Sequence, residues 1–346
     1  MELSIGYPEE HEARSARREN LHSRDRSWNR MALQAYYEVK PFVPEWLTFA
    51  LRRWRVRYQR RKYQGIWPID PSCAIPPVNW NGWPDNKQFA FILTHDVEWG
   101  EGQDKSLQLA QAEEQLGFRS AFYFVPRRYP DNAELREQLT KMNFEVGVHG
   151  LYHDGKLYRS HKVFSQRAIL INEYMRAWGA SGFRSPSMHH KLEWMHELEI
   201  LYDASTFDVD PFEPQADGSG TIYPFLVTDP DSKHSYVELP YTLPQDCLLY
   251  LMCNEKDASI WKRKLDWVAQ HGGMAMLITH PDYVAMGEAS KRFRTYPLSI
   301  YEDLLNYVKT RYAGQYWQAL PREVAQYLRD QAEFSRELKP AVREII

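Results

Sequence analysis

The sequence predicts an α/β fold, and more narrowly a distorted β/α barrel of about seven parallel strands behind an N-terminal extension. From residue 88 onward, short and continuously apolar runs alternate with helical patterns, which is typical of parallel strands buried on both faces. The length of 346 residues is enough for one barrel of about 250 residues and an additional segment.

Seven apolar runs are the expected strands, and helical patterns lie between or after them. The strands are FAFILTHD (89–96), SAFYFV (120–125), FEVGVH (144–149), SGFRS (181–185), LYDAS (201–205), YVELP (236–240) and MAMLITH (274–280). The expected helices span residues 104–116, 131–142, 163–178, 191–200, 257–270, 299–311 and 321–332. This order predicts one barrel-like domain at 86–332 and a C-terminal tail at 333–346.

Residues 1–85 form an N-terminal basic and proline-rich extension in this scheme. The segment 40–63 carries eight basic residues against one glutamate and has the spacing of a basic amphipathic helix. Such a helix either packs on the main domain with its arginines in solvent or meets an anionic lipid or another anionic ligand. Five prolines in 67–86 exclude a helix or a central strand there and indicate an extended strap leading into the barrel.

Composition argues against several classes of protein. A net charge of −3 gives no reason to expect a nucleic-acid partner. The three cysteines, Cys73, Cys247 and Cys253, form no CxxC pair, so they indicate free thiols rather than a disulfide framework or a zinc knuckle. The first twenty residues lack the apolar core of a signal peptide, and no run reaches the roughly 18 apolar residues of a membrane span. We therefore expect a cytoplasmic protein.

Five of the seven expected strands end on ionisable side chains. These residues are Asp96 and Glu98 for the first strand, His149 and His153 for the third, Arg184 for the fourth, Asp203 for the fifth and His280 for the last. In a β/α barrel the carboxyl ends of the strands meet at one face, where active sites lie. A long loop with a Gly-Ser-Gly centre, 211–225, is a further candidate for the site.

The spacing of these residues indicates a metal site. Asp96 and Glu98 are two apart on an extended strand and share a face, so a cation between them would relieve their repulsion. His149 and His153 are four apart and share a face if the chain turns helically after the strand. Two imidazoles and one carboxylate are a typical catalytic zinc set. Each signal taken alone is more often structural, as a helix cap, a salt-bridge partner or a core histidine.

Two neighbouring residues are expected to support the site rather than form it. His95 alternates with Asp96 along the strand, so its side chain should face away from the barrel mouth. Asp154 directly follows the second histidine of the pair. It either hydrogen-bonds a ligand imidazole or caps an ordinary turn.

The order of these residues resembles that of the polysaccharide deacetylase family, the NodB-homology domain of carbohydrate esterase family 4. The corresponding motifs are THDVE (94–98), HGLYH (149–153), RSP (184–186), YDAS (202–205) and LITH (277–280). The resemblance covers residues 90–320, approximately. The first motif departs from the common TFDD form, because Val97 separates the two acids and the second acid is Glu98.

The resemblance implies a metal-dependent hydrolase that removes an N-acyl group, most simply N-acetyl, from an amino sugar in a glycan or glycan precursor. Glu98, His149 and His153 would bind a divalent metal ion, with zinc preferred. A cytosolic enzyme would act on a soluble or lipid-linked precursor, and the segment 40–63 would then hold it near an anionic membrane. Two alternatives stay open: a hydrolase of another C–N bond, such as a deformylase or non-sugar amidase, and a barrel that binds glycans without catalysis.

The resemblance also implies which residues transfer protons. Asp96 would be the general base, and Arg184 would orient it and keep it ionised. His280 would be the general acid that protonates the leaving amine, and Asp203 would orient His280. Binding alone requires neither an acid nor a base, so Asp96, Arg184 and His280 favour an enzyme over a glycan-binding barrel.

Overall fold

The computed structural model describes residues 45–78, 80–215, 217–229, 235–287 and 294–341, and the chain divides into two compact units, Met1–Gln64 and Gly65–Ile346. In the first unit, the described residues form helix α2 (Glu45–Lys62), which confirms the helix expected within 40–63. The expectations for residues 1–44 lie outside the described residues. Every helix in the described part of the chain is too short or too polar to cross a membrane.

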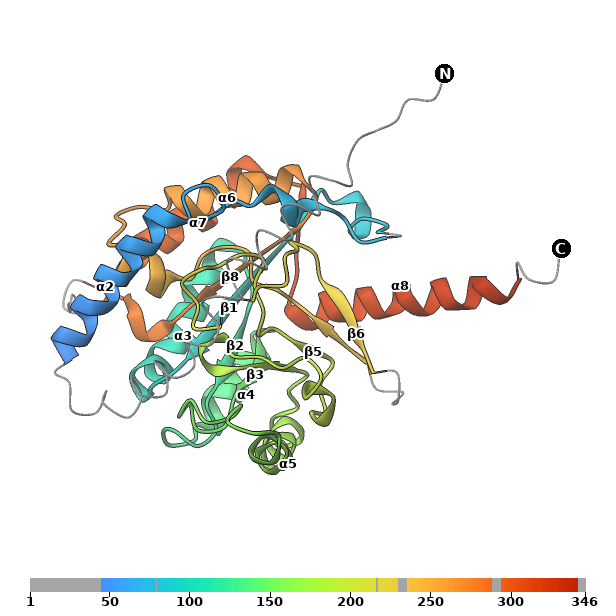
Figure 1. Cartoon of the computed structure of the whole chain (residues 1–346), viewed down its shortest axis with the longest axis horizontal. Coiled ribbons are helices and arrows are strands. Elements are labelled where there is room, and N and C mark those ends of the chain that lie inside the picture. Colours follow the sequence, from blue (N-terminus) through green and yellow to red (C-terminus); the bar gives the residue numbers. More distant parts are fainter. Residues whose placement is uncertain (1–44, 79, 216, 230–234, 288–293, 342–346) are drawn as a thin grey trace, which may run out of the picture. The chain divides into compact units, whose positions relative to one another are not determined.

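The second unit is built on one mostly parallel sheet that curls into a distorted barrel (Figure 1). The strand order is β11-β1-β2-β3-β4-β5-β7-β6, and β8 also pairs with β1. The strands are β1 (Phe89–Val97), β2 (Ser120–Phe124), β3 (Glu145–His149), β4 (Gly182–Arg184), β5 (Tyr202–Asp203), β6 (Phe225–Thr228), β7 (Ser235–Glu238), β8 (Met274–Thr279) and β11 (Tyr316–Gln318). Seven of them, β1 to β5, β7 and β8, lie where the sequence predicts strands and pair in parallel, which confirms the fold class.

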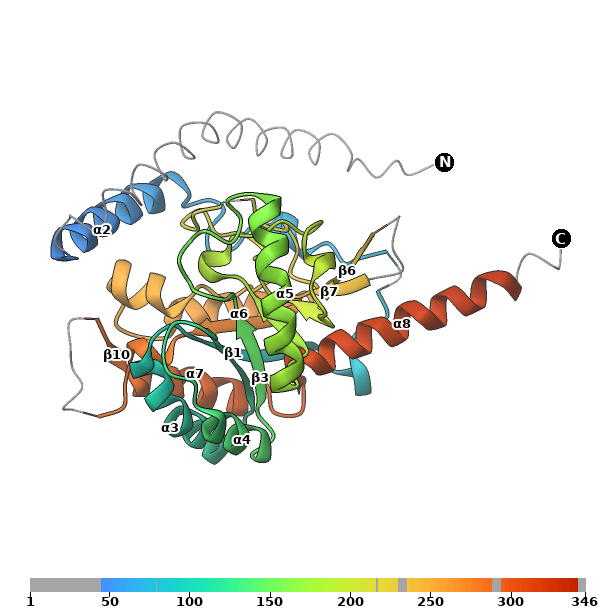
Figure 2. The same ribbon diagram turned by 90° about the horizontal axis from the view of Figure 1, so that it is seen from below.

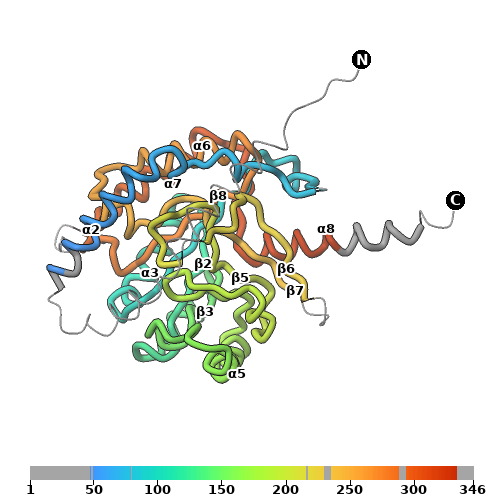
Figure 3. Tube along the Cα trace, viewed as in Figure 1, coloured from blue at the N-terminus to red at the C-terminus, as the bar shows by residue number. Residues whose placement is uncertain are grey.

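The barrel closes through single bridges rather than through a full strand. Phe207 pairs with Tyr241, and Leu243 pairs with Leu277 in β8, both in parallel. β8 in turn pairs with β1 along its whole length. β6 is antiparallel to β7 and ends the strand order (Figure 3). The parallel pairing of β8 with β1 brings their carboxyl ends together, and both ends carry candidate site residues.

Six helices of the described chain accompany the sheet in this unit. They are α3 (Gly100–Leu116), α4 (Ala133–Lys141), α5 (His161–Trp178), α6 (Ser259–Gln270), α7 (Leu298–Arg311) and α8 (Pro321–Ala341). In Figures 1 and 2, α3, α4 and α5 pack beside β1, β2 and β3, and α6 packs on β8. α8 continues through Ala341, so residues 333–341, expected as a tail, are helical.

The helix expected at 191–200 does not form. Turns and a short 3₁₀ helix, Met195–Glu197, occupy this segment. Asn172 of α5 donates its amide hydrogen to the carbonyl of Glu197 at 2.9 Å and accepts from the backbone N–H of Glu199 at 2.9 Å. These tertiary contacts satisfy backbone groups that an α-helix would have paired internally.

The boundary between the two units falls at 64/65 rather than at 85/86, because the proline-rich segment packs into the barrel unit. Trp67 and Trp83 are buried, and the Trp83 indole donates to the carbonyl of Gly272 at 2.8 Å. As expected, the described residues of 67–86 form neither an α-helix nor a strand, and they contain two short 3₁₀ helices. Two large buried indoles therefore attach this segment to the barrel.

Strand β1 positions the site. All nine of its residues are buried, and Ile92 belongs to the hydrophobic cluster inside the barrel together with Tyr123 and Met276. Because side chains alternate along a strand, Asp96 faces the same interior four residues later. Apolar packing along the strand thus delivers one carboxylate to the mouth of the barrel.

Candidate metal centre and active site

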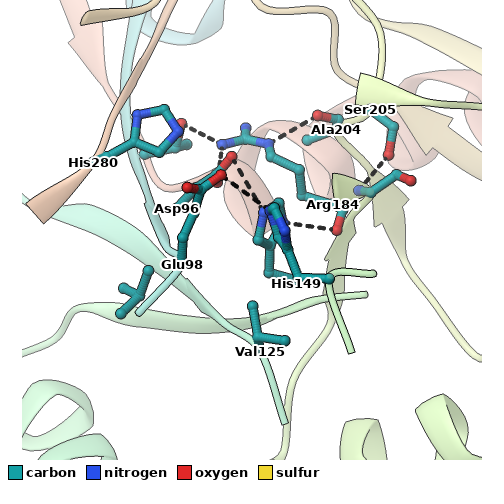
Figure 4. A network of polar contacts seen from close by, with 12 residues as sticks. Asp96, Glu98, Val125, His149, Arg184, Ala204, Ser205 and His280 are labelled. Atoms are coloured by element: carbon teal, nitrogen blue, oxygen red, sulfur yellow. Dashed lines mark hydrogen bonds and ion pairs between the residues drawn. The ribbon is translucent and has the colours of Figure 1, made fainter. Parts of the chain in front are cut away.

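The carboxyl end of β1 holds an ion pair between Asp96 and Arg184 (Figure 4). Arg184 Nη1 donates to Asp96 Oδ1 at 2.9 Å, and both side chains are buried. The same guanidinium donates to Thr94 Oγ1 and to the carbonyl of Ala204, both at 2.9 Å, and lies over the Tyr123 ring. These contacts fix the guanidinium, so β4 determines where the acid of β1 lies.

Asp96 is held as a carboxylate by its neighbours. Burial alone would raise its pKa, but the Arg184 guanidinium, with smaller contributions from His149 and His280, lowers the pKa below the ordinary value of aspartate. His149 Nε2 lies 3.9 Å from Asp96 Oδ2, the oxygen that does not contact Arg184. An ionised carboxylate at this place can accept a proton from water or from a bound substrate.

Glu98, His149 and His153 come together beside this ion pair. One donor atom of each lies within 4.8 Å of the donor atoms of the other two. The two imidazole centroids are 5.1 Å apart, and His153 Nε2 lies 3.0 Å from Glu98 Oε1. The structure therefore assembles the three metal ligands that the sequence predicts, from β1 and β3.

Three observations show that these side chains fit a metal ion. His149 Nδ1 lies 3.1 Å from the carbonyl oxygen of Arg184, which can only accept, so Nδ1 carries the hydrogen and Nε2 keeps its lone pair. His153 Nε2 is buried, and its polar neighbour is Glu98 Oε1, another atom of the same donor set. Burial also lowers the pKa of His149 to about 4, so its ring is neutral at pH 7, as a metal ligand must be.

The two histidines meet through a left-handed turn rather than the helical turn that their spacing suggests. Gly150 has a φ of 63° and His153 has a φ of 52°. A Cβ at Gly150 would lie 2.6 Å from the ring of Pro186, so the backbone here requires glycine. A left-handed conformation at a residue other than glycine, as at His153, occurs more often at functional sites.

Two residues that the sequence analysis does not identify support Glu98. Tyr283 OH donates to Glu98 Oε2 at 2.9 Å, and the Asp282 carboxylate accepts from the backbone N–H of Glu98 at 2.9 Å. Burial would raise the pKa of Glu98, but His153 beside it helps to hold the pKa well below its ordinary value. The position of both residues directly after the last motif is the only signal in the sequence that points to them.

His280, just after β8, pairs with Asp246. Asp246 Oδ1 lies 2.6 Å from His280 Nδ1, and Asp246 Oδ2 accepts from the backbone N–H of His280 at 2.8 Å. Burial alone would lower the pKa of His280, but the Asp246 carboxylate raises it to about 10. His280 is therefore protonated at neutral pH and can donate a proton.

Asp203 does not orient His280, which corrects the expectation from the sequence. Its buried carboxylate accepts from Ser205 Oγ at 2.6 Å and lies beside the carboxyl group of Glu238 on β7. β5 and β7 are adjacent parallel strands that pair Asp203 with Glu238, and this register holds the two acids together. Asp246 occupies the place that the sequence analysis gives to Asp203.

Tertiary pairing explains why Asp246 escapes detection in the sequence. It lies at the start of a π-helix, Cys247–Met252, and no strand pattern or motif marks it. Leu243, three residues before Asp246, forms a bridge with Leu277 of β8, which is three residues before His280. The bridge therefore places Asp246 close to His280. The contact is therefore a consequence of barrel closure.

The residues expected to support the site do so in different ways. His95 faces away from the barrel mouth and contacts Thr279 Oγ1 at 2.7 Å and Glu113 Oε1 at 2.8 Å, which confirms its structural role. Asp154 forms an ion pair with Arg167 at 2.7 Å and accepts from a backbone N–H two residues on. Of its two expected roles, the structure thus favours the turn cap.

Solved structures that include the following three are similar to the chain, whereas no family model and no curated protein matches its sequence. A structure from Mycobacterium smegmatis assigned as a polysaccharide deacetylase has a TM-score of 0.52 and 15% identity, and the match covers 72% of this chain and 93% of that chain. The PuuE allantoinase has a TM-score of 0.54 and 15% identity over 75% of this chain and 96% of that chain. A structure from Pseudomonas aeruginosa PAO1, also assigned as a polysaccharide deacetylase, has a TM-score of 0.52 and 15% identity over 76% of this chain and 95% of that chain.

At such identities the similarity concerns the fold. It covers 72–76% of this chain and nearly the whole of each similar structure. The chain therefore has the NodB-like fold of the polysaccharide deacetylases, which is the fold that its sequence motifs imply.

Proposed function

We propose that this protein is a metal-dependent hydrolase that removes an N-acyl group, most simply N-acetyl, from an amino sugar. The observation that carries the proposal is the arrangement of three parts at one barrel mouth. An ionised acid, Asp96, and a protonated imidazole, His280, accompany the donor set of Glu98, His149 and His153. A base, an acid and a cation site together are what hydrolysis of an amide requires.

A divalent ion held by Glu98, His149 and His153 would supply a Lewis acid for the acyl oxygen. Asp96 would take the proton from the attacking water, and Arg184 keeps this carboxylate ionised for that purpose. His280 would then give its proton to the leaving nitrogen. Asp246 holds the imidazole in place, and its negative charge favours the return of the imidazolium form.

The metal assignment has a direct test. Purified protein should contain about one divalent ion per chain, with zinc favoured by the imidazole and carboxylate donors. Elemental analysis of Glu98→Ala and His149→Ala should show loss of most of this metal. Unchanged metal content in both variants would contradict the assignment of these ligands.

The activity has two candidate substrate classes. Release of acetate from N-acetylated chitin-type oligosaccharides would support the sugar deacetylase. The match to an allantoinase favours the second candidate, a hydrolase of another C–N bond such as a deformylase or non-sugar amidase. Turnover of a panel of small formamides and amides, without acetate release from the sugars, would support this second candidate. Glycan binding without any turnover would leave only a binding barrel.

We extend the proposal to a cytoplasmic, membrane-associated enzyme with a lipid-linked glycan substrate. In α2 the side chains of Leu51, Trp54 and Tyr58 are exposed by 56%, 69% and 65% and lie three or four residues apart on one face. Arg55 and Arg57 flank this face on the helical wheel. An apolar stripe between arginines suits the interface of an anionic membrane. The three free cysteines support a reducing compartment.

Liposome co-sedimentation tests this contact. The protein should sediment with anionic vesicles at low salt and be released at high salt, because screening weakens the attraction of arginine to the surface. Trp54→Ser should weaken the binding, since it removes the largest exposed apolar side chain of the stripe. Equal and negligible binding to neutral and anionic vesicles would leave α2 with a packing role only.

A further inference from the structure

A second set of metal-type donors lies beside the catalytic acid. Asp246, Cys247 and His280 each offer one donor atom, and these atoms all lie within 4.8 Å of one another. Asp246 and His280 are buried, whereas Cys247 is partly exposed and gives access from solvent. Oxygen, sulfur and nitrogen donors in one group suit zinc and cobalt, not calcium or magnesium.

The fold holds these donors in place. Asp246 caps the π-helix Cys247–Met252, accepting from the backbone N–H of Cys247 at 2.6 Å. The same carboxylate accepts from the backbone N–H of His280 at 2.8 Å. One carboxylate thus ties the start of the helix to the end of β8. π-Helical turns occur frequently at functional sites.

Acidic side chains surround the thiol of this group. Burial raises the pKa of the Cys247 thiol, and the nearby carboxyl groups of Asp246, Glu213 and Glu98 raise it further. Glu213 comes from the loop 211–225 that the sequence analysis singled out, and Gln245 donates to it at 2.5 Å. A bound divalent ion reverses this effect, because its charge stabilises both the thiolate and the carboxylates.

We propose that Asp246, Cys247 and His280 form a second, inhibitory binding site for a zinc-type ion, filled at metal concentrations above those that load Glu98, His149 and His153. Metal–sulfur, metal–nitrogen and metal–oxygen bonds form and replace the hydrogen bond between His280 and Asp246, while the thiol proton and one imidazolium proton leave to solvent, without any change of oxidation state. His280 then keeps a single N–H and is no longer the imidazolium acid. This inhibitory effect rests on the proposed function, whereas the binding itself does not.

Cobalt titration tests the binding. With Co²⁺ added to the metal-free protein beyond one equivalent, a thiolate-to-cobalt charge-transfer absorption should develop in the near ultraviolet. Cys247→Ser should abolish this absorption, and Cys253→Ser, a matched change at the other end of the same π-helix, should retain it. Glu98→Ala should lose the first ion and still develop the thiolate absorption. No such absorption at any Co²⁺ concentration, or an equal one in Cys247→Ser, would overturn the site.

Zinc inhibition tests the consequence. Each protein is compared with its own rate at one equivalent of Zn²⁺. Excess Zn²⁺ should slow the wild type and Cys253→Ser, and Cys247→Ser should need roughly tenfold or more Zn²⁺ for the same inhibition. Equal inhibition of all three would overturn the inhibitory role. If no substrate is turned over, the proposed function fails, while the cobalt spectra still decide whether the second site exists.

Discussion

Asp96 and Asp203 are both aspartates at the ends of buried parallel strands, and their surroundings give them opposite properties. Asp96 faces the guanidinium of Arg184, whose charge outweighs the cost of burial and lowers the pKa of Asp96. Asp203 faces Glu238, and burial raises its pKa to about 6. Arg184 lies between the two in strand order, on β4. The comparison shows that the strand end supplies a carboxyl group, and that the charge of its nearest partner decides whether that group is ionised.

Burial raises the pKa of both acids in the pair of Asp203 and Glu238, that of Glu238 well above its ordinary value. Asp203 Oδ2 and Glu238 Oε2 are buried and have no hydrogen-bond partner among the described residues. Glu238 Oε1 accepts from the backbone N–H of Thr206 at 3.0 Å. Two buried carboxyl groups without a cation are stable only while they share a proton.

The largest expected effect is on turnover. Asp96→Asn keeps the shape and removes the base, so kcat should fall by roughly 10²-fold or more with little change in KM. Asp203→Asn should change kcat by less than about threefold, because this residue touches neither the donor set nor His280. Steady-state kinetics of both variants with the same substrate is the measurement. Similar losses in the two would break the distinction between them.

The second prediction concerns the pH dependence of the acid. Catalysis needs protonated His280, so activity should decline as pH rises through its folded pKa of about 10. Asp246→Asn removes the charge that raises this pKa, and the alkaline limb of kcat/KM should move down by about one pH unit or more. Asp203→Asn serves as the control and should leave the pH of the alkaline decline in kcat/KM unchanged. An unmoved limb in Asp246→Asn would mean that another group is the acid.

The smallest expected effect is on stability. The folded pair binds more protons than the unfolded chain at pH values between the ordinary and the raised pKa, so this pair loses stability as pH rises through that window. Glu238→Gln replaces the titrating acid by an amide that can still donate to Asp203. The wild type should lose stability from pH 5 to pH 8, and the variant should lose less. The difference in free energy of unfolding, variant minus wild type, should therefore rise by roughly 1 kcal/mol or more between these two pH values. Urea unfolding of both proteins at the two pH values measures the difference, and a pH-independent difference would show that the pair does not titrate.

Much of the site could be predicted because it depends on local backbone rules. Alternation along β1 places Asp96 and Glu98, and the parallel strands bring His149 and Arg184 to the same edge. The helix expected at 191–200 and the helical turn after β3 were wrong, because Asn172 and the left-handed residues near Gly150 override local preference. Local patterns carry no information about such contacts.

The sequence by itself determined the parallel α/β architecture and the carboxylate and imidazole donors at the strand ends. Each of these follows from period, spacing or backbone conformation within a few residues. Only the tertiary structure decided that Asp246 rather than Asp203 holds His280, and that Asp203 lies beside Glu238 instead. The physical reason is that a pKa and a hydrogen-bond partner depend on the charges a few ångströms away in space, and barrel closure brings those charges from distant parts of the chain.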